Sequence, residues 1–158
     1  MAYLVDGNNL LGRISPEELR DRRGRDGLIV RLLAFQKVIP RRIILVFDGK
    51  PDGELTEVRV NDKFTIHYPG EGSTADDVIK HFIDHQTDKR KFFVVSSDRD
   101  IKDFAKARGI ESIGSDDFYR QLKKALRERK EQKEMEKWAE EPSSLEIKLW
   151  DEVFKSKP

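Results

Sequence analysis

Hydrophobic residues along the chain form short unbroken runs, separated by longer stretches in which they recur every three or four positions. Three of the runs, rich in β-branched and aromatic residues, end at Val5, Phe47 and Val95. Such runs are typical of strands that are covered on both faces, whereas the longer spacing is typical of amphipathic helices. Their alternation predicts an α/β domain with a mostly parallel central sheet flanked by helices.

Capping and turn residues set the expected limits of these elements. Ser15 is followed by Pro16 and Glu18, a capping-box arrangement that predicts a helix start. Asn61 and the residue after it predict a hairpin turn, and Gly109 predicts a helix end. The predicted strands cover residues 2–5, 43–47, 55–60, 64–68, 92–95 and 110–113. The predicted helices begin at residue 15 and cover residues 26–39, 73–86 and 99–107, with a long last helix from residue 115.

The last part of the chain has a different composition from the rest. Residues 127–137 are almost wholly charged and are expected to be solvated. After a break at Pro142, apolar residues between Leu145 and Phe154 fall on one helical face, which predicts a tail that docks either on its own domain or on a partner. We therefore expect one domain over residues 1–125 and a charged helix extension with an amphipathic tail over residues 126–158.

Composition limits the classes of function. The 158 residues suit a single domain, and 31 basic against 30 acidic residues leave a net charge of +1, so nucleic-acid binding would need local patches. The chain has no cysteine, which excludes disulfides and thiolate sites and agrees with a reducing compartment. The chain shows neither a signal segment nor an apolar run of membrane-spanning length, so we expect a cytoplasmic protein without membrane partners.

Acidic residues recur where predicted strands end or helices begin. Asp6, Asp48 and Asp98 follow strands, and Asp76 and Asp77 lie in the first turn of a helix. The carboxyl ends of parallel strands share one edge of a sheet, so these carboxylates are expected to converge there. Aspartates at such positions also form turns or complement helix dipoles, and Asp77 fits an exposed position beside its neighbour.

Converging carboxylates repel one another unless a cation joins them. Mg²⁺ and Mn²⁺ prefer oxygen ligands, keep several waters, and act beside phosphates during in-line displacement. The acidic edge therefore predicts divalent-metal chemistry on a phosphodiester. Asp100 fits either a ligand or a residue of a first helical turn, whereas Asp116 and Asp117 fit caps of the last helix.

Four short motifs, taken together, resemble the NYN domain family, and most closely its YacP-like branch within the PIN-like nuclease superfamily. The resemblance covers about residues 1–125, and its order and spacing suit an α/β fold. The four motifs are Val5-Asp6-Gly7-Asn8-Asn9, Val46-Phe47-Asp48-Gly49, Ser73-Thr74-Ala75-Asp76-Asp77 and Ser96-Ser97-Asp98.

The resemblance implies a PIN-like three-layer fold, a Mg²⁺ or Mn²⁺ site, and endonucleolytic cleavage of single-stranded RNA. Asn8 departs from the family, which commonly has an aromatic residue there. The matching positions imply catalytic, metal-binding acids at Asp6, Asp76 and Asp98, a further metal ligand at Asp48, and supporting residues at Asn9, Ser97 and Asp100.

An RNA backbone beside this edge would need cations. Basic residues crowd the segment after the first motif, and another follows Asp48, although charges on a surface helix are often solvated or paired. The residues expected to bind RNA are Arg13, Arg22, Arg23, Arg25 and Lys50.

Other functions remain open on sequence alone. A catalytically silent RNA-binding or ribonucleoprotein-docking module could keep the same fold, but the matching acids argue against it. A phosphatase with an aspartate nucleophile would need a second aspartate two residues after Asp6, where Asn8 stands. His81 and His85 lack a third ligand for zinc and fit a surface pair. The oligomeric state, and whether the target is free RNA or RNA in an assembly, are not predicted.

Overall fold

The computed structural model describes residues 1–15, 22–49 and 56–140. Its centre is a six-stranded sheet in the order β3-β4-β2-β1-β5-β6, in which all neighbouring strands are parallel except the β3–β4 hairpin. The strands are β1 (Ala2–Asp6), β2 (Arg42–Val46), β3 (Glu57–Asn61), β4 (Phe64–His67), β5 (Phe92–Val95) and β6 (Glu111–Ile113). The predicted α/β class with a mostly parallel sheet is confirmed.

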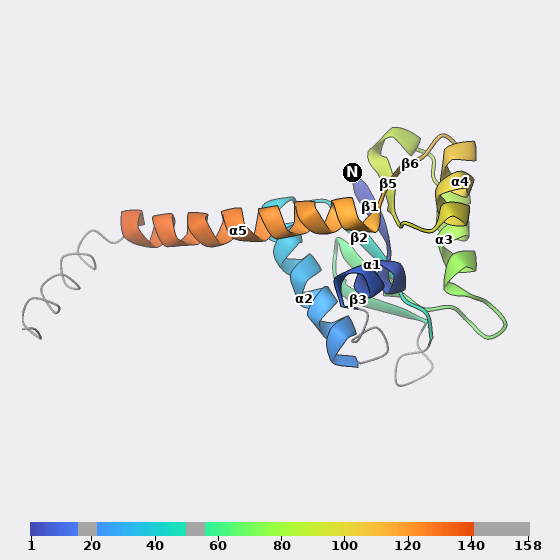
Figure 1. The fold of residues 1–158 in the computed structure, drawn as a ribbon, viewed down its shortest axis with the longest axis horizontal. Coiled ribbons are helices and arrows are strands. Elements are labelled where there is room, and N and C mark those ends of the chain that lie inside the picture. The colour runs from blue at the N-terminus through green and yellow to red at the C-terminus, as the bar shows by residue number, and fades with distance from the viewer. Residues whose placement is uncertain (16–21, 50–55, 141–158) are drawn as a thin grey trace, which may run out of the picture.

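Helices cover both faces of the sheet, which gives the three layers expected from the sequence (Figure 1). One layer contains α1, α2 and α5, and the other contains α3 and α4, which lie side by side. The helices are α1 (Gly7–Ile14), α2 (Arg22–Val38), α3 (Ala75–Asp84), α4 (Arg99–Ala107) and α5 (Ser115–Glu140), with a short 3₁₀ turn η2 (Lys89–Lys91) before β5.

Successive strand residues point to opposite faces, and this alternation assigns each apolar residue to one of two cores. In β1, Tyr3 and Val5 pack with α2 and α5, whereas Leu4 packs with α3 and α4. The rings of Tyr3, Phe35 and Phe118 meet at centroid separations of 5.4 to 6.0 Å and join the sheet to α2 and α5. The two cores hold the carboxyl edge of the sheet in place.

The sequence failed to predict the first helix. The chain enters α1 directly at Gly7, because Asp6 takes the N-cap position and Leu10 and Leu11 become fully buried. Glycine and asparagine are poor helix formers, so tertiary packing here overrides local propensity. The predicted helix start at Ser15 runs into residues 16–21, which lie outside the described part. The next helix begins at Arg22, four residues before its predicted start.

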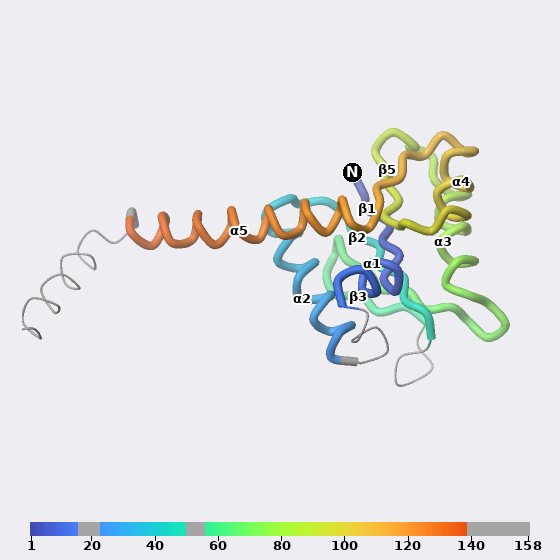
Figure 2. The backbone as a smooth tube through the Cα atoms, in the orientation of Figure 1, coloured from blue at the N-terminus to red at the C-terminus, as the bar shows by residue number. Residues whose placement is uncertain are grey.

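The last helix leaves the body of the domain. Along α5, Phe118, Leu122 and Ala125 are buried, whereas most described side chains after Leu126 are exposed. The backbone tube shows this second half of α5 extending away from the sheet (Figure 2). The predicted amphipathic tail lies outside the described residues. No helix among the described residues is both long and apolar enough to cross a membrane.

Candidate active site at the carboxyl edge of the sheet

The alternation of the strands sends two polar residues toward the layer of α3 and α4. Asp6 follows Leu4 by two positions at the end of β1, and Ser96 follows Val94 by two positions after β5. β1 and β5 are parallel neighbours, with Val5 opposite Val95, so both polar side chains reach the same place. Asp6 is 7% exposed and Ser96 is fully buried.

The hydroxyl of Ser96 links two of the acidic motifs. It donates a hydrogen bond to Asp6 Oδ2 at 2.8 Å and accepts one from the backbone N–H of Asp98 at 3.1 Å. Because a hydroxyl both donates and accepts, one buried side chain fixes the Asp6 carboxylate against the turn that carries Asp98. The sequence prediction assigned the supporting hydroxyl to Ser97 and missed Ser96.

The other two acids come from the starts of helices in the same layer. Asp76 lies in the first turn of α3, whose N-cap is Thr74 in a capping box with Asp77. Asp98 is the N-cap of α4, and its Oδ1 accepts hydrogen bonds from the N–H groups of Asp100 and Ile101. Asp98 therefore has a capping role, and its Oδ2 has no hydrogen-bond partner among the described residues.

Asp6, Asp76 and Asp98 influence one another electrostatically. Burial raises the pKa of Asp6 to about 6, and the negative charges of Asp76 and Asp98 add to the rise, while Ser96 and the backbone N–H of Asn9 oppose it. Burial also raises the pKa of Asp76, and Asp98 adds to that rise. Three acids from three separate elements are thus near enough for their charges to interact, and a cation between them would relieve their repulsion.

Asp100 lies at the rim and is paired. Its Oδ2 accepts a hydrogen bond from Lys80 Nζ at 2.6 Å, which raises the pKa of that lysine. The ammonium group also lies 5.3 Å from the ring centroid of Phe104. This pair joins α3 to α4 beside the acids, and it keeps a positive charge next to Asp76.

Two asparagines of α1 join the ends of the strands. Asn9 Oδ1 accepts hydrogen bonds from the backbone N–H of Ser97 at 2.9 Å and from Ser115 Oγ at 2.6 Å. Ser97 Oγ in turn accepts one from the N–H of Ser115 at 2.9 Å. Asn8 Oδ1 accepts the N–H of Asp48 at 3.1 Å. These contacts agree with the supporting positions expected for Asn9 and Ser97, and they add Ser115 to the same hydrogen-bond network.

Asp48 takes a different position from the other acids. It is exposed, and its hydrogen bonds to described residues use its backbone N–H and its carbonyl, which accepts from Arg25 Nη2 at 2.7 Å. β2 has already ended at Val46, so strand alternation no longer directs this side chain. A role of Asp48 in metal binding stays a prediction.

The cations expected to bind RNA are dispersed. Arg25 holds the Asp48 carbonyl and lies over the ring of Phe47 at 5.1 Å, so it has a structural contact. Arg13 lies 3.6 Å from Asp116, and Arg23 is exposed. The side chain of Arg22 and all of Lys50 lie outside the described part. Their contact with RNA stays a prediction.

The donor set suits a hard divalent ion, although it is not preassembled. Among the described residues, no three acidic or histidine side chains stand close enough together to hold a metal as they are. Carboxylates that repel one another are expected to stay apart without a counterion. Three carboxylates beside a rim open to solvent are the oxygen ligands that Mg²⁺ and Mn²⁺ take. His81 and His85 are exposed, with ring centroids 4.1 Å apart, as a surface pair.

Ser96→Ala is expected to weaken the binding of Mn²⁺ between tenfold and about a hundredfold, the usual effect of removing a group that orients a metal ligand. The Asp6 carboxylate would lose the hydrogen bond that fixes its Oδ2. Calorimetric titration with Mn²⁺ measures the change. Ser112→Ala, on the half-buried strand β6, is the matched control. Equal affinities in all three proteins would contradict the role of Ser96.

The raised pKa of Asp6 predicts a pH-dependent stability without metal. Between about pH 4 and pH 6 the folded state keeps a proton that the unfolded state releases, so the free energy of unfolding falls as pH rises through this window. Asp6→Asn cannot titrate there and is expected to be more stable than wild type at pH 8, by on the order of 2 kcal/mol.

Urea denaturation in a chelator at pH 4 and at pH 8 measures this difference. Asp103→Asn, at an exposed position on α4, is the control and should follow wild type at both pH values. If the difference in stability between Asp6→Asn and wild type were the same at pH 4 and at pH 8, the surroundings would not disfavour the Asp6 carboxylate.

Comparison with known proteins confirms the fold and the family resemblance. The sequence matches the family model of the YacP-like NYN domain over residues 3–156. The structure is similar to the crystal structure of Rae1 (YacP) from Bacillus subtilis, with a TM-score of 0.70 and 24% sequence identity over 99% of this chain and 91% of that chain. A tryptophan-to-leucine mutant of that protein matches with a TM-score of 0.67 and 23% identity over 91% and 89% of the two chains. No curated protein matches the sequence. The predicted PIN-like α/β fold is confirmed.

Proposed function

The chain belongs to the YacP-like NYN domain family, and from this membership and its acidic edge we propose that it is a metal-dependent endoribonuclease. Its reaction would be hydrolysis of phosphodiester bonds in single-stranded RNA. The observation that carries the proposal is a buried Asp6, held by Ser96 and coupled to Asp76 and Asp98 from two helix starts.

Asp6, Asp76 and Asp98 would hold a Mg²⁺ or Mn²⁺ ion. When bound, such an ion supplies Lewis acidity and an activated water for in-line displacement at phosphorus. Asp6 would be the anchor, because Ser96 fixes one of its oxygens and burial makes its charge the most costly to leave uncompensated. Asp98 would contribute Oδ2, since α4 already uses Oδ1.

The surrounding residues would keep these acids in position during the reaction. Asn9 and Ser115 join the turn after β5 to α1 and α5, so the loop that carries Asp98 is tied on both sides. Lys80, paired with Asp100 at the rim, would limit the repulsion of a phosphate that approaches so many carboxylates. A rigid frame of this kind supports catalysis by holding reacting groups in register.

An end-labelled RNA cleavage assay tests the proposal. Single-stranded and structured RNAs, with DNA of the same sequences, are incubated in Mg²⁺, in Mn²⁺ and in EDTA. We expect internal cuts in single-stranded RNA that require metal. A protein that bound RNA but neither bound metal nor cut any substrate would instead be a silent RNA-binding module of the same fold.

A further inference from the structure

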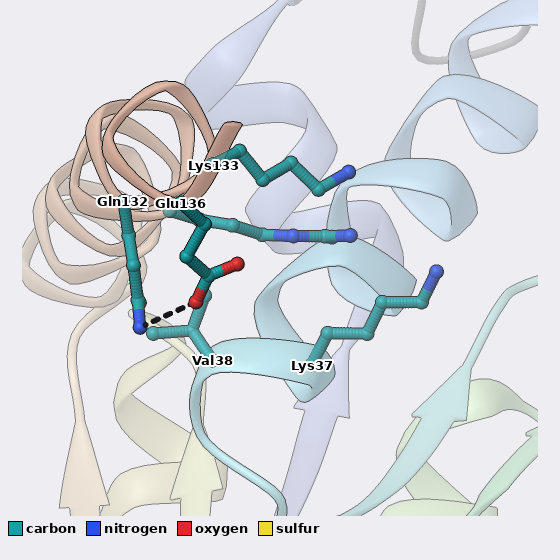
Figure 3. Close-up of a pocket in the computed structure, with 6 residues that line it drawn as sticks. Lys37, Val38, Gln132, Lys133 and Glu136 are labelled. Atoms are coloured by element: carbon teal, nitrogen blue, oxygen red, sulfur yellow. Dashed lines mark hydrogen bonds between the residues drawn. The ribbon is translucent and has the colours of Figure 1, made fainter. Parts of the chain in front are cut away.

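A groove with basic walls lies between α2 and α5, away from the acidic edge (Figure 3). It forms where α2 ends and α5 continues past it. Val38 forms its apolar side. The lining residues are Lys37 and Val38 of α2 and Arg129, Gln132, Lys133 and Glu136 of α5.

Along one side of α5, apolar residues give way to basic residues at the groove. Phe118, Leu122 and Ala125 bury one side of α5 against the domain, and the same side continues with Arg129 and Lys133. Like charges four residues apart destabilise a helix by a few tenths of a kcal/mol. Arg129 makes one long hydrogen bond to the backbone of α2, but no ion pair among the described residues neutralises Arg129 or Lys133, so their charges are better explained by an anionic ligand than by stability.

The charges of the groove are separated. Gln132 Nε2 donates to Glu136 Oε1 at 3.3 Å, and the side chains of Lys37 and Lys133 extend away from this pair toward the opposite side (Figure 3). Arg129 Nη1 donates to the Ala34 carbonyl at 3.4 Å.

None of the three cations forms an ion pair within residues 1–15, 22–49 and 56–140. Elsewhere in the same part of the chain, Lys80 and Arg108 are each paired with an aspartate. With three cations and the one carboxylate of Glu136, the groove keeps a net positive charge that suits an anionic ligand.

We propose that this groove binds phosphate groups of an RNA strand at a distance from the bond that is cut, an inference that rests on the proposed function. α2 joins the two places: Arg25 in its first half contacts the Asp48 carbonyl at the acidic edge, and Lys37 in its last turn lines the groove. Further cations occur on the same two helices, Arg31 on α2 and Lys123 and Arg127 on α5. The strand of an RNA carries a phosphate at every nucleotide, so it could contact cations at both places.

The separation predicts a dependence on substrate length. Arg25 and Lys37 are 12 positions apart in α2, which corresponds to about 18 Å at 1.5 Å per residue. With phosphates spaced by at least about 3.4 Å along a strand, about five nucleotides or fewer would cross that distance. An oligomer of about three nucleotides would therefore reach only the acidic edge, whereas one of about fifteen would occupy both places.

The test compares Lys37→Glu/Lys133→Glu with wild type and with Lys91→Glu/Lys106→Glu. The control pair changes the net charge equally, at exposed positions in η2 and α4 on the other side of the sheet. Fluorescence anisotropy with labelled oligouridylates of both lengths is measured in EDTA, so that binding is followed without cleavage. Equal urea denaturation curves confirm that all variants are folded.

We expect the groove variant to bind the long oligomer on the order of tenfold more weakly, with a salt dependence shallower by about two phosphate contacts. In the cleavage assay its KM for the long oligomer should rise while kcat stays unchanged, and the short oligomer should be unaffected. The control pair should behave as wild type. Equal weakening of RNA binding by both pairs of substitutions would overturn the inference. So would a groove that binds polyglutamate, a polyanion without phosphate, as tightly as it binds RNA. A protein that binds RNA through the groove but never cuts it would refute the proposed function, while the inference about the groove would still hold.

Discussion

Asp6→Asn is expected to lower the rate of metal-dependent RNA cleavage on the order of a thousandfold, while the protein stays folded. The amide keeps the size of the carboxylate and can still accept the Ser96 hydroxyl hydrogen, so the frame of the site is preserved. What is lost is the charge that would hold the ion. Single-turnover cleavage of an end-labelled RNA in Mn²⁺ measures the effect, with Asp103→Asn as the control.

The double variant Asp6→Asn/Asp98→Asn sharpens this test. If both acids serve one ion, the second substitution should add little to the first, since residues that act as a unit have non-additive effects. Asparagine is as good an N-cap as aspartate, so Asp98→Asn should not unfold α4. If the loss of cleavage rate in the double variant equalled the product of the two single losses, the two acids would act independently. An active Asp6→Asn protein would show that Asp6 is not part of the metal centre.

Gly7→Ala is expected to destabilise the protein by about 3 kcal/mol. A Cβ atom at this position would lie 2.7 Å from two ring atoms of Phe47 and 2.8 Å from the Val46 carbonyl oxygen. Neither neighbour can move freely, because Phe47 is fully buried beneath Arg25 and the Val46 carbonyl belongs to the sheet. The close approach lets α1 begin directly after β1, which places Asn9 at the site.

Urea denaturation measures the loss, and Gly27→Ala is its matched control. Gly27 also lies within a helix, but a Cβ there would meet no described atom within 4 Å other than the backbone of its own helix. This control should therefore gain up to about 1 kcal/mol from helix propensity. A Gly7→Ala variant as stable as the control would contradict the packing described for α1.

Most of the sheet could be predicted from the sequence because its signals are local. The unbroken apolar runs located β1, β2 and β5, and capping and stop residues gave the limits of α4. α1 could not be predicted in this way. Its first residues favour turns, and only the burial of Leu10 and Leu11 against a distant part of the chain makes them helical.

The site shows the same division between local and distant information. The acids were recognisable because each follows a strand or begins a helix. Ser96 was missed although strand alternation, continued two residues beyond Val94, would have directed it toward Asp6. Ser115 could not be assigned to the site from the sequence, because its contact with Asn9 joins residues 106 positions apart. Asp48 followed a strand like the others, but its side chain lies beyond the last position that the sheet directs.

Crystals grown in Mn²⁺ and measured at the manganese absorption edge would test the central claim most directly. We expect an anomalous peak among Asp6, Asp76 and Asp98, with Asp6 contributing an oxygen and Ser96 still donating to it. The same crystals of Asp6→Asn should lose the peak. A manganese ion bound at another place, or an unchanged peak in the variant, would contradict the assignment of this edge as the metal centre.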